Sequence, residues 1–262
     1  MSKKKLQIVV IGARGNLRNP FLESQLAEFD VTYIKPVIVL ARGPVEPEAA
    51  RVANRRILGR DLLNSEIGCA LAHEAARACL KDDWGLILED DVQIESEVIH
   101  EAERLVSQGT FALPAIITLL DAVQIPGQKI KIERLNHMPG RTIAYLASGS
   151  ASKLDESLNS RIGTADWPLS FLGANFYAIR GTGVSDCGSV STVDTTGERK
   201  GGSIAYYKNA LTNFFPLLKS FGKDAVRYSI LLPARRDFAN RKRRATGVVL
   251  GWIGFPKKPA RQ

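Results

Sequence analysis

Three carboxylate residues stand next to one another directly after a short apolar run. Glu89, Asp90 and Asp91 follow the run 86–88 (LIL). Adjacent carboxylates repel one another and resist burial, so they need compensation. Strand alternation turns Glu89 and Asp91 to one side and Asp90 to the other. Two oxygen ligands on one side are typical of Mg²⁺ or Mn²⁺ sites, and the simpler interpretation is a solvated acidic turn.

A predicted helix precedes this acidic cluster. Asn64 or Ser65 is suited to cap its first turn, where Glu66 complements the positive end of the helix dipole. Apolar residues recur at helical spacing and predict the core-facing side: Ile67, Leu71, Ala75 and Ala78. Glu66 and His73 share a second side, with Arg77 one turn further on. This polar stripe either lines a ligand site or is a structural stripe that holds the acidic cluster from behind.

Two arginines follow the first predicted strand, residues 6–11. Arg14 and Arg18 lie in the loop after it, where a guanidinium group can meet the base or the phosphates of a nucleotide. Solvated loop arginines are the alternative. The run 12–15 (GARG) does not match the G-x-G-x-x-G fingerprint of dinucleotide-binding folds, which argues against an NAD site.

The surrounding pattern predicts an α/β domain that positions these side chains. Short apolar and β-branched runs indicate strands at 6–11, 31–34, 37–40, 86–88, 115–120 and 144–147. Helices are predicted at about 20–29, from residue 64 or 65 to about 81, and at about 151–158. No periodicity is evident in the arginine-rich stretch 41–61, and 182–202 is predicted to be a long loop. Ligands of open α/β sheets gather at the carboxyl ends of the strands, where the acidic cluster falls.

Composition limits the classes of protein to consider. The chain has 262 residues, 45% hydrophobic and 24% charged, which suits one globular domain and excludes a mainly disordered protein. Its net charge is +9; residues 231–262 carry nine basic residues and one acid, +8, which leaves +1 for residues 1–230. A nearly neutral body argues against nucleic-acid binding. Three cysteines without metal-type spacing favour a reducing, cytoplasmic compartment, and no segment approaches the roughly 20 apolar residues of a membrane span.

The helix and the acidic cluster together resemble glycosyltransferase family 25, which includes lipopolysaccharide galactosyltransferases. The resemblance rests on 63–73 (LNSEIGCALAH) followed by 86–92 (LILEDDV), which are similar to the family pattern L-x-x-G-E-I-G-C-x-x-S-H and then I-L-E-D-D. Ser65 and Ala72 depart from that pattern by exchanging one small residue for another. Weaker resemblances cover 8–26, 144–148, 165–169 and 191–192.

The resemblance implies a GT-A-like, Rossmann-type nucleotide-sugar fold and inverting transfer of a hexose. It implies galactose from UDP-galactose as the donor sugar and a lipooligosaccharide-type glycan as the acceptor. Glu89 and Asp91 would hold Mn²⁺ or Mg²⁺ and the donor diphosphate, with Asp90 near the donor's ribose or sugar. The donor site would also include four other residues: Arg14, Arg18, Glu66 and His73. A catalytically inactive nucleotide- or glycan-binding protein on the same fold is the rival interpretation.

Inverting transfer needs a base that takes the proton of the attacking acceptor hydroxyl. Asp166, in the run 166–169 (DWPL), is the first candidate, and Trp167 beside it is suited to stack on a sugar ring. A turn or cap aspartate before a proline is the alternative interpretation. Asp121, which follows the strand predicted at 115–120, is the competing candidate.

The chain divides into a catalytic domain, residues 1–230, and a basic tail, residues 231–262. The tail combines its basic residues with the apolar run 248–255 (VVLGWIGF). This combination is typical of a segment that lies on an anionic bilayer, so we expect a peripheral position at the inner membrane face. A nucleic-acid-binding arm and a disordered end are the alternatives.

Overall fold

Runs of β-branched and apolar residues form a central sheet of seven strands. The computed structural model describes residues 6–37, 39, 46–80, 83–108, 111–119, 131–135, 139, 142–156, 161–163, 167–180, 184–187, 212–216 and 218–219. The strands are β1 (Gln7–Ile11), β2 (Val31–Ile34), β3 (Trp84–Glu89), β5 (Ala115–Thr118), β6 (Lys131–Arg134), β7 (Ala144–Ser148) and β8 (Asn175–Arg180). A separate two-stranded ribbon joins β4 (Val92–Gln93) to β9 (Ser185–Asp186).

The sheet is mixed, with the strand order β2-β1-β3-β7-β5-β8-β6. Strands β1, β2 and β3 run parallel, and so do β5 and β8. Strand β7 is inserted antiparallel between β3 and β5, and β6 is antiparallel to β8. The carboxyl ends of β1, β2, β3, β5 and β8 therefore lie at the same edge as the amino end of β7. This α/β arrangement agrees with the predicted class, and the antiparallel strands are a feature that local patterns did not reveal.

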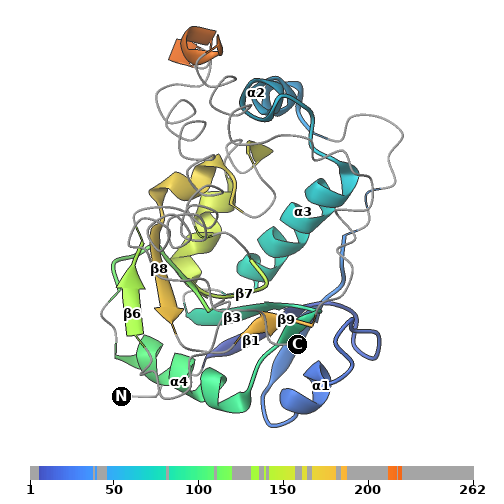
Figure 1. The fold of residues 1–262 in the computed structure, drawn as a ribbon, viewed down its shortest axis with the longest axis vertical. Coiled ribbons are helices and arrows are strands. Elements are labelled where there is room, and N and C mark those ends of the chain that lie inside the picture. The colour runs from blue at the N-terminus through green and yellow to red at the C-terminus, as the bar shows by residue number, and fades with distance from the viewer. Residues whose placement is uncertain are drawn as a thin grey trace, which may run out of the picture.

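Helices cover both faces of the sheet (Figure 1). One face packs against α1 (Leu22–Gln25) and α4 (Ser96–Ser107), whose buried side chains join one apolar cluster with alternate residues of β1, β3, β5 and β7. The other face packs against α3 (Asn64–Ala78) and the 3-10 helices η1 (Gly149–Glu156) and η3 (Leu169–Gly173). Period-two alternation in the strands separates the two clusters.

Several predicted elements are confirmed and several are not. The helix from residue 64 and the strands at 6–11, 31–34, 86–88, 115–120 and 144–147 are all present. The core-facing side predicted for that helix is wrong, because Ala78 is exposed and Leu71 and Ala75 are only half-buried. The buried side instead includes Ala72 and Ala76 together with the polar stripe of Glu66, His73 and Arg77. The helix expected at 20–29 is only the four residues of α1, and that expected at 151–158 is the 3-10 helix η1. Val37 and Val39 are not in a strand. The stretch 41–61, where no periodicity was evident, contains α2 (Glu48–Leu58), whose buried side chains recur at helical spacing: Ala50, Ala53, Asn54 and Ile57.

The described part of the chain contains no helix with the length and apolar character that crossing a membrane requires. The tail, residues 231–262, lies outside the described residues, as does most of the loop 182–202.

Candidate functional site

The acidic cluster lies where β3 ends, at the carboxyl edge of the sheet. Glu89 is the last residue of β3, and Asp90 and Asp91 form the turn that leads into β4. Because the strand ends at Glu89, the alternation that predicted Glu89 and Asp91 on one side does not extend to Asp91. Asp90 and Asp91 instead share one partner, Arg18, whereas Glu89 contacts His73 and Thr142.

Arg18 holds the two aspartates of the turn. Its Nη2 lies 2.5 Å and its Nε 2.6 Å from Oδ1 of Asp90, and its Nη1 lies 3.0 Å from Oδ2 of Asp91. Burial lowers the pKa of the Arg18 guanidinium, but the hydrogen bond to Asp90 and the surrounding negative charges outweigh burial and raise this pKa above its usual value. One guanidinium group thus contacts two partly buried carboxylates and offsets one of their two negative charges.

The loop that carries Arg18 is fastened to the acidic turn by its backbone. The buried Asn19 donates its N–H to the carbonyl oxygen of Asp90 at 2.8 Å and its Nδ2 to that of Val92 at 2.6 Å. Gly12, at the end of β1, lies so close to the turn that a Cβ placed there would be 2.8 Å from Cβ of Asp90. The contact therefore requires glycine at this position.

Glu89 contacts a different set of residues from Asp90 and Asp91, a series of hydrogen-bonded side chains (the polar chain) that begins with His73. Its Oε1 accepts a hydrogen bond from Oγ1 of Thr142 at 2.9 Å and lies 3.3 Å from Nε2 of His73. Among the described residues, no hydrogen-bond partner reaches Oε2. Burial raises the pKa of Glu89, but the contacts with His73 and Thr142 and the charge of Arg18 outweigh it and hold this pKa below its usual value.

The polar chain continues from His73 across the face that α3 covers. Nδ1 of His73 lies 3.1 Å from Oη of Tyr145, which also accepts a hydrogen bond from Nη1 of Arg77 at 3.0 Å. Arg77 in turn donates from Nε and Nη2 to both carboxylate oxygens of Asp155, at 2.7 and 2.8 Å. Burial raises the pKa of Tyr145 to about 12. The polar stripe predicted on α3 is therefore partly a support that holds Glu89 from behind.

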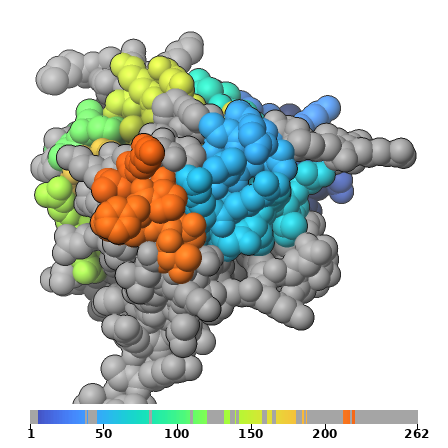
Figure 2. Space-filling view, turned by 90° about the horizontal axis from the view of Figure 1, so that it is seen from above, coloured from blue at the N-terminus to red at the C-terminus, as the bar shows by residue number. Residues whose placement is uncertain are grey.

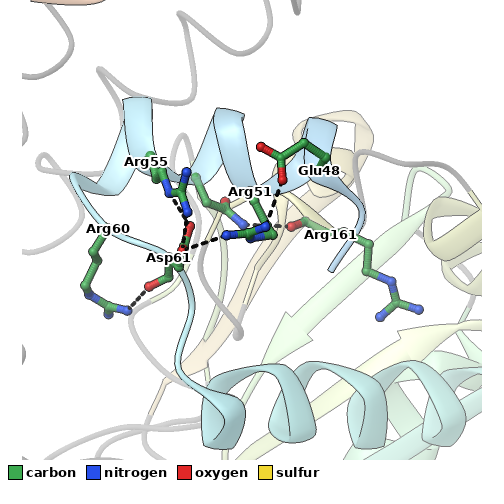
Figure 3. A network of polar contacts seen from close by, with 7 residues as sticks. Glu48, Arg51, Arg55, Arg60, Asp61 and Arg161 are labelled. Atoms are coloured by element: carbon green, nitrogen blue, oxygen red, sulfur yellow. Dashed lines mark hydrogen bonds and ion pairs between the residues drawn. The ribbon is translucent and has the colours of Figure 1, made fainter. Parts of the chain in front are cut away.

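Glu66 lies in the first turn of α3, about half the length of the helix away from His73 and the polar contacts just described. Its two carboxylate oxygens accept hydrogen bonds from Arg60 at 2.7 and 2.8 Å, and Oε2 also accepts the N–H of Leu63 at 2.9 Å. Figure 3 shows Arg60 at the end of an arginine network on α2. The N-cap residue is Leu63, and it makes no side-chain cap bond. The prediction that Asn64 or Ser65 caps this helix is therefore wrong, and the Glu66 carboxylate accepts the backbone N–H of the N-cap residue instead.

The remaining predicted site residues have different outcomes. Arg14 is exposed in the loop after β1. Trp167 is fully buried against Tyr145, Phe171 and Phe176, so the prediction that it stacks on a sugar ring is wrong for this structure. Asp166 and Asp121, the two candidate bases, both lie outside the described residues.

Three contributors to the site were missed by sequence reasoning. Asn19 precedes Pro20, and an Asn-Pro pair is a turn signal that marks the loop for attention. Thr142 and Asp155 have no such signal, because each acts through a partner more than fifty residues away in the chain: Glu89 and Arg77 respectively.

The arrangement gathers a guanidinium group, two aspartates and a supported glutamate at one edge of an α/β sheet. Ligands of open α/β sheets bind at such an edge. The comparison with models of known protein families finds no match for the chain, and the comparison with curated proteins finds none.

Proposed function

We propose that this chain is an inverting glycosyltransferase on a GT-A-like fold, which moves a hexose from a nucleotide-sugar donor to a glycan acceptor. The observation that carries the proposal is the meeting of Arg18 with Asp90 and Asp91 at the carboxyl edge of the sheet, beside the supported Glu89. The resemblance to family 25 adds the expected pair of substrates: UDP-galactose and a lipooligosaccharide- or lipopolysaccharide-type acceptor.

Arg18 is the proposed contact for the donor diphosphate. Its side chain is 29% exposed, and its guanidinium nitrogens contact Asp90 and Asp91. A guanidinium group pairs with phosphate oxygens through two parallel hydrogen bonds. Arg14, exposed on the same loop, is the second proposed donor contact.

Mn²⁺ or Mg²⁺, which the resemblance implies, requires carboxylates that converge. Within the described ranges, no group of three His, Cys, Asp or Glu side chains is arranged to hold a metal ion. Arg18 lies between Asp90 and Asp91, and Glu89 turns toward His73. The residues in this arrangement do not fit a metal site, so we assign no step to a metal. Transfer measured with excess chelator, and with Mn²⁺ restored, tests the metal requirement that the resemblance implies.

The reaction proposed is a single displacement. The acceptor hydroxyl oxygen bonds to the anomeric carbon of the donor while the bond from that carbon to the diphosphate oxygen breaks, and the electron pair leaves with the nucleoside diphosphate. The hydroxyl proton passes to a carboxylate, for which Asp166 is proposed and Asp121 is the competitor. Replacement of the true base by asparagine should lower kcat about 10²–10⁴-fold and leave donor affinity near that of the wild type.

A screen of nucleotide sugars, with and without glycan acceptors, tests the proposed activity. The Arg18→Ala variant should bind the productive donor roughly 10- to 100-fold more weakly, because it loses charge-assisted hydrogen bonds. Arg104→Ala is the matched control, since Arg104 pairs with Glu101 on the exposed side of α4. Unchanged donor binding in Arg18→Ala would remove Arg18 from the donor site.

One observation favours the rival function, a binding protein without activity. Arg18 already contacts both Asp90 and Asp91, so its guanidinium group is engaged without a ligand. Donor hydrolysis and transfer distinguish the two functions. Saturable nucleotide binding without turnover, for every donor and acceptor in the screen, would favour the binding protein.

The tail, residues 231–262, is proposed to attach the protein to an anionic membrane surface. Each basic residue near such a surface contributes about 1 kcal/mol, and the attraction weakens as salt is added. A chain without residues 231–262 should sediment less with anionic vesicles than the full chain does. Equal sedimentation of the two would assign the tail to another role.

A further inference from the structure

An apolar patch lies outside the candidate site, on the segment 212–219. Three large hydrophobic side chains of this short segment are exposed: Phe214 by 37%, Phe215 by 78% and Leu218 by 41%. The two phenylalanine rings lie edge to face, with centroids 5.2 Å apart. Neighbouring exposed aromatic side chains of this kind usually mark an interaction surface.

The segment rests on helix α2. Nδ2 of Asn213 donates to the carbonyl oxygen of Arg56 at 3.4 Å, and Nη1 of Arg56 donates to that of Pro216 at 3.3 Å. Figure 2 shows the segment, in orange, beside α2, in blue, on one face of the molecule. The aromatic side chains are thus presented from a folded support.

The helix that supports the patch is rich in basic residues. Helix α2 carries Arg51, Arg55 and Arg56 against one acid, Glu48, and Lys219 is exposed at the end of the segment. Asp61 pairs with Arg51 and Arg55, as Figure 3 shows. These four basic residues and two acidic residues give helix α2, Asp61 and Lys219 together a net charge of +2. Apolar side chains that emerge among cations suit the boundary of an anionic bilayer, where rings enter the acyl region and cations meet headgroups.

We propose that the segment 212–219 and helix α2 form a docking surface for an anionic lipid bilayer. The surface belongs to the folded body of the protein and is separate in sequence from the tail. It does not depend on the proposed transfer reaction, because its readout is vesicle binding and not activity. A second copy of the chain is a less suitable occupant, since the net positive charge of one patch would repel that of the other.

Co-sedimentation of the full chain with vesicles of phosphatidylcholine, with and without phosphatidylglycerol, tests the proposal. Phe215→Ser should lower the partition coefficient for anionic vesicles roughly tenfold, since a ring that entered the bilayer is lost. Phe21→Ser is the matched control, because Phe21 is 69% exposed and precedes α1, at a distance from the patch. The tail is present in both variants, so its contribution cancels in their ratio.

Two further variants separate charge from folding. Lys219→Glu should weaken binding to anionic vesicles, whereas Lys153→Glu, a reversal at an exposed residue of η1, should have a smaller effect. Phe215→Trp keeps the aromatic bulk, and its fluorescence should shift to shorter wavelength when anionic vesicles are added. This variant gives a reading even where Phe215→Ser fails to fold.

Three results would overturn the proposal. The first is equal vesicle binding by Phe215→Ser and Phe21→Ser. The second is the absence of any fluorescence shift in Phe215→Trp upon vesicle addition. The third is self-association of the wild type, without vesicles, that Phe215→Ser abolishes, which would assign the surface to a second copy of the chain.

Discussion

Replacement of Arg77 by methionine should cost far more stability than the loss of one arginine on the surface. Arg77 is 2% exposed and donates two hydrogen bonds to Asp155, whose side chain is 6% exposed, and one to Tyr145. Its guanidinium carbon also lies 4.7 Å from the centroid of the Phe171 ring. Methionine fills much of the same volume but leaves the Asp155 carboxylate buried without its cation.

The magnitude follows from that uncompensated charge. Removal of one partner from a buried ion pair costs about 3–5 kcal/mol, whereas an exposed pair contributes about 0–1 kcal/mol. Urea unfolding at neutral pH measures the difference as a shift of the midpoint at constant slope. Arg104→Met is the matched control, because Arg104 is 52% exposed and pairs with Glu101 at 2.6 Å.

A double variant separates the loss of the charge pair from the loss of packing. Arg77→Met combined with Asp155→Leu replaces both charges by apolar groups, so the double variant should be more stable than Arg77→Met alone. Equal costs for Arg77→Met and Arg104→Met would refute the reasoning. So would a double variant whose cost equals the sum of the two single costs, because the pair would then contribute no coupling energy.

Three further predictions concern the candidate site. The pKa of Glu89 is lower in the folded protein than its ordinary value of 4.5. The ionised Glu89 therefore contributes its full stabilisation above pH 4.5, and this contribution is lost as pH falls through the lower folded pKa. Urea unfolding across this pH range should show a weaker dependence of stability on acid in Glu89→Gln than in the wild type. The pKa of Tyr145 is raised from 10.0 to about 12, so the free energy of unfolding should fall as pH rises from 10.0 toward 12. In an absorbance titration of the tyrosine phenolates, Tyr145→Phe should remove the step that occurs near the raised pKa of about 12. Gly12→Ala should destabilise the chain by about 1–3 kcal/mol and weaken donor binding, because its Cβ would meet Asp90. Its control is Gly15→Ala, because a Cβ added to Gly15 would meet no atom within 4 Å, although the φ of 77° strains an alanine there. Donor binding should be retained in Gly15→Ala.

Local patterns in the sequence were sufficient for the elements that carry the acidic cluster. Strand β3 is a short apolar run, and apolar residues at helical spacing were enough to locate α3. They did not give its buried side, because the core packs against Ala72 and Ala76 and Ala78 is exposed. Helix α2 was not predicted because its buried side is mostly alanine and because three arginines dominate its composition: Arg51, Arg55 and Arg56. The three residues Ala50, Ala53 and Ile57 carry the helical spacing that could have revealed it.

The order of the strands was beyond the reach of local patterns. Strand β7 pairs with β3 from more than fifty residues away, and it enters antiparallel between β3 and β5. A run such as 144–147 predicts a buried strand equally well in either direction, since both faces of such a strand are covered. The pairing depends on the whole set of loops and helices that fold around the sheet.

The sequence by itself determined which chemical groups stand at the end of β3: three carboxylates that need compensation. The tertiary structure decided what compensates them. Arg18 arrives from the loop after β1, and His73 reaches Glu89 from α3 with Tyr145 behind it. The charge of a carboxylate is a property of its residue type, whereas its partner depends on which distant segments the fold brings within hydrogen-bonding distance.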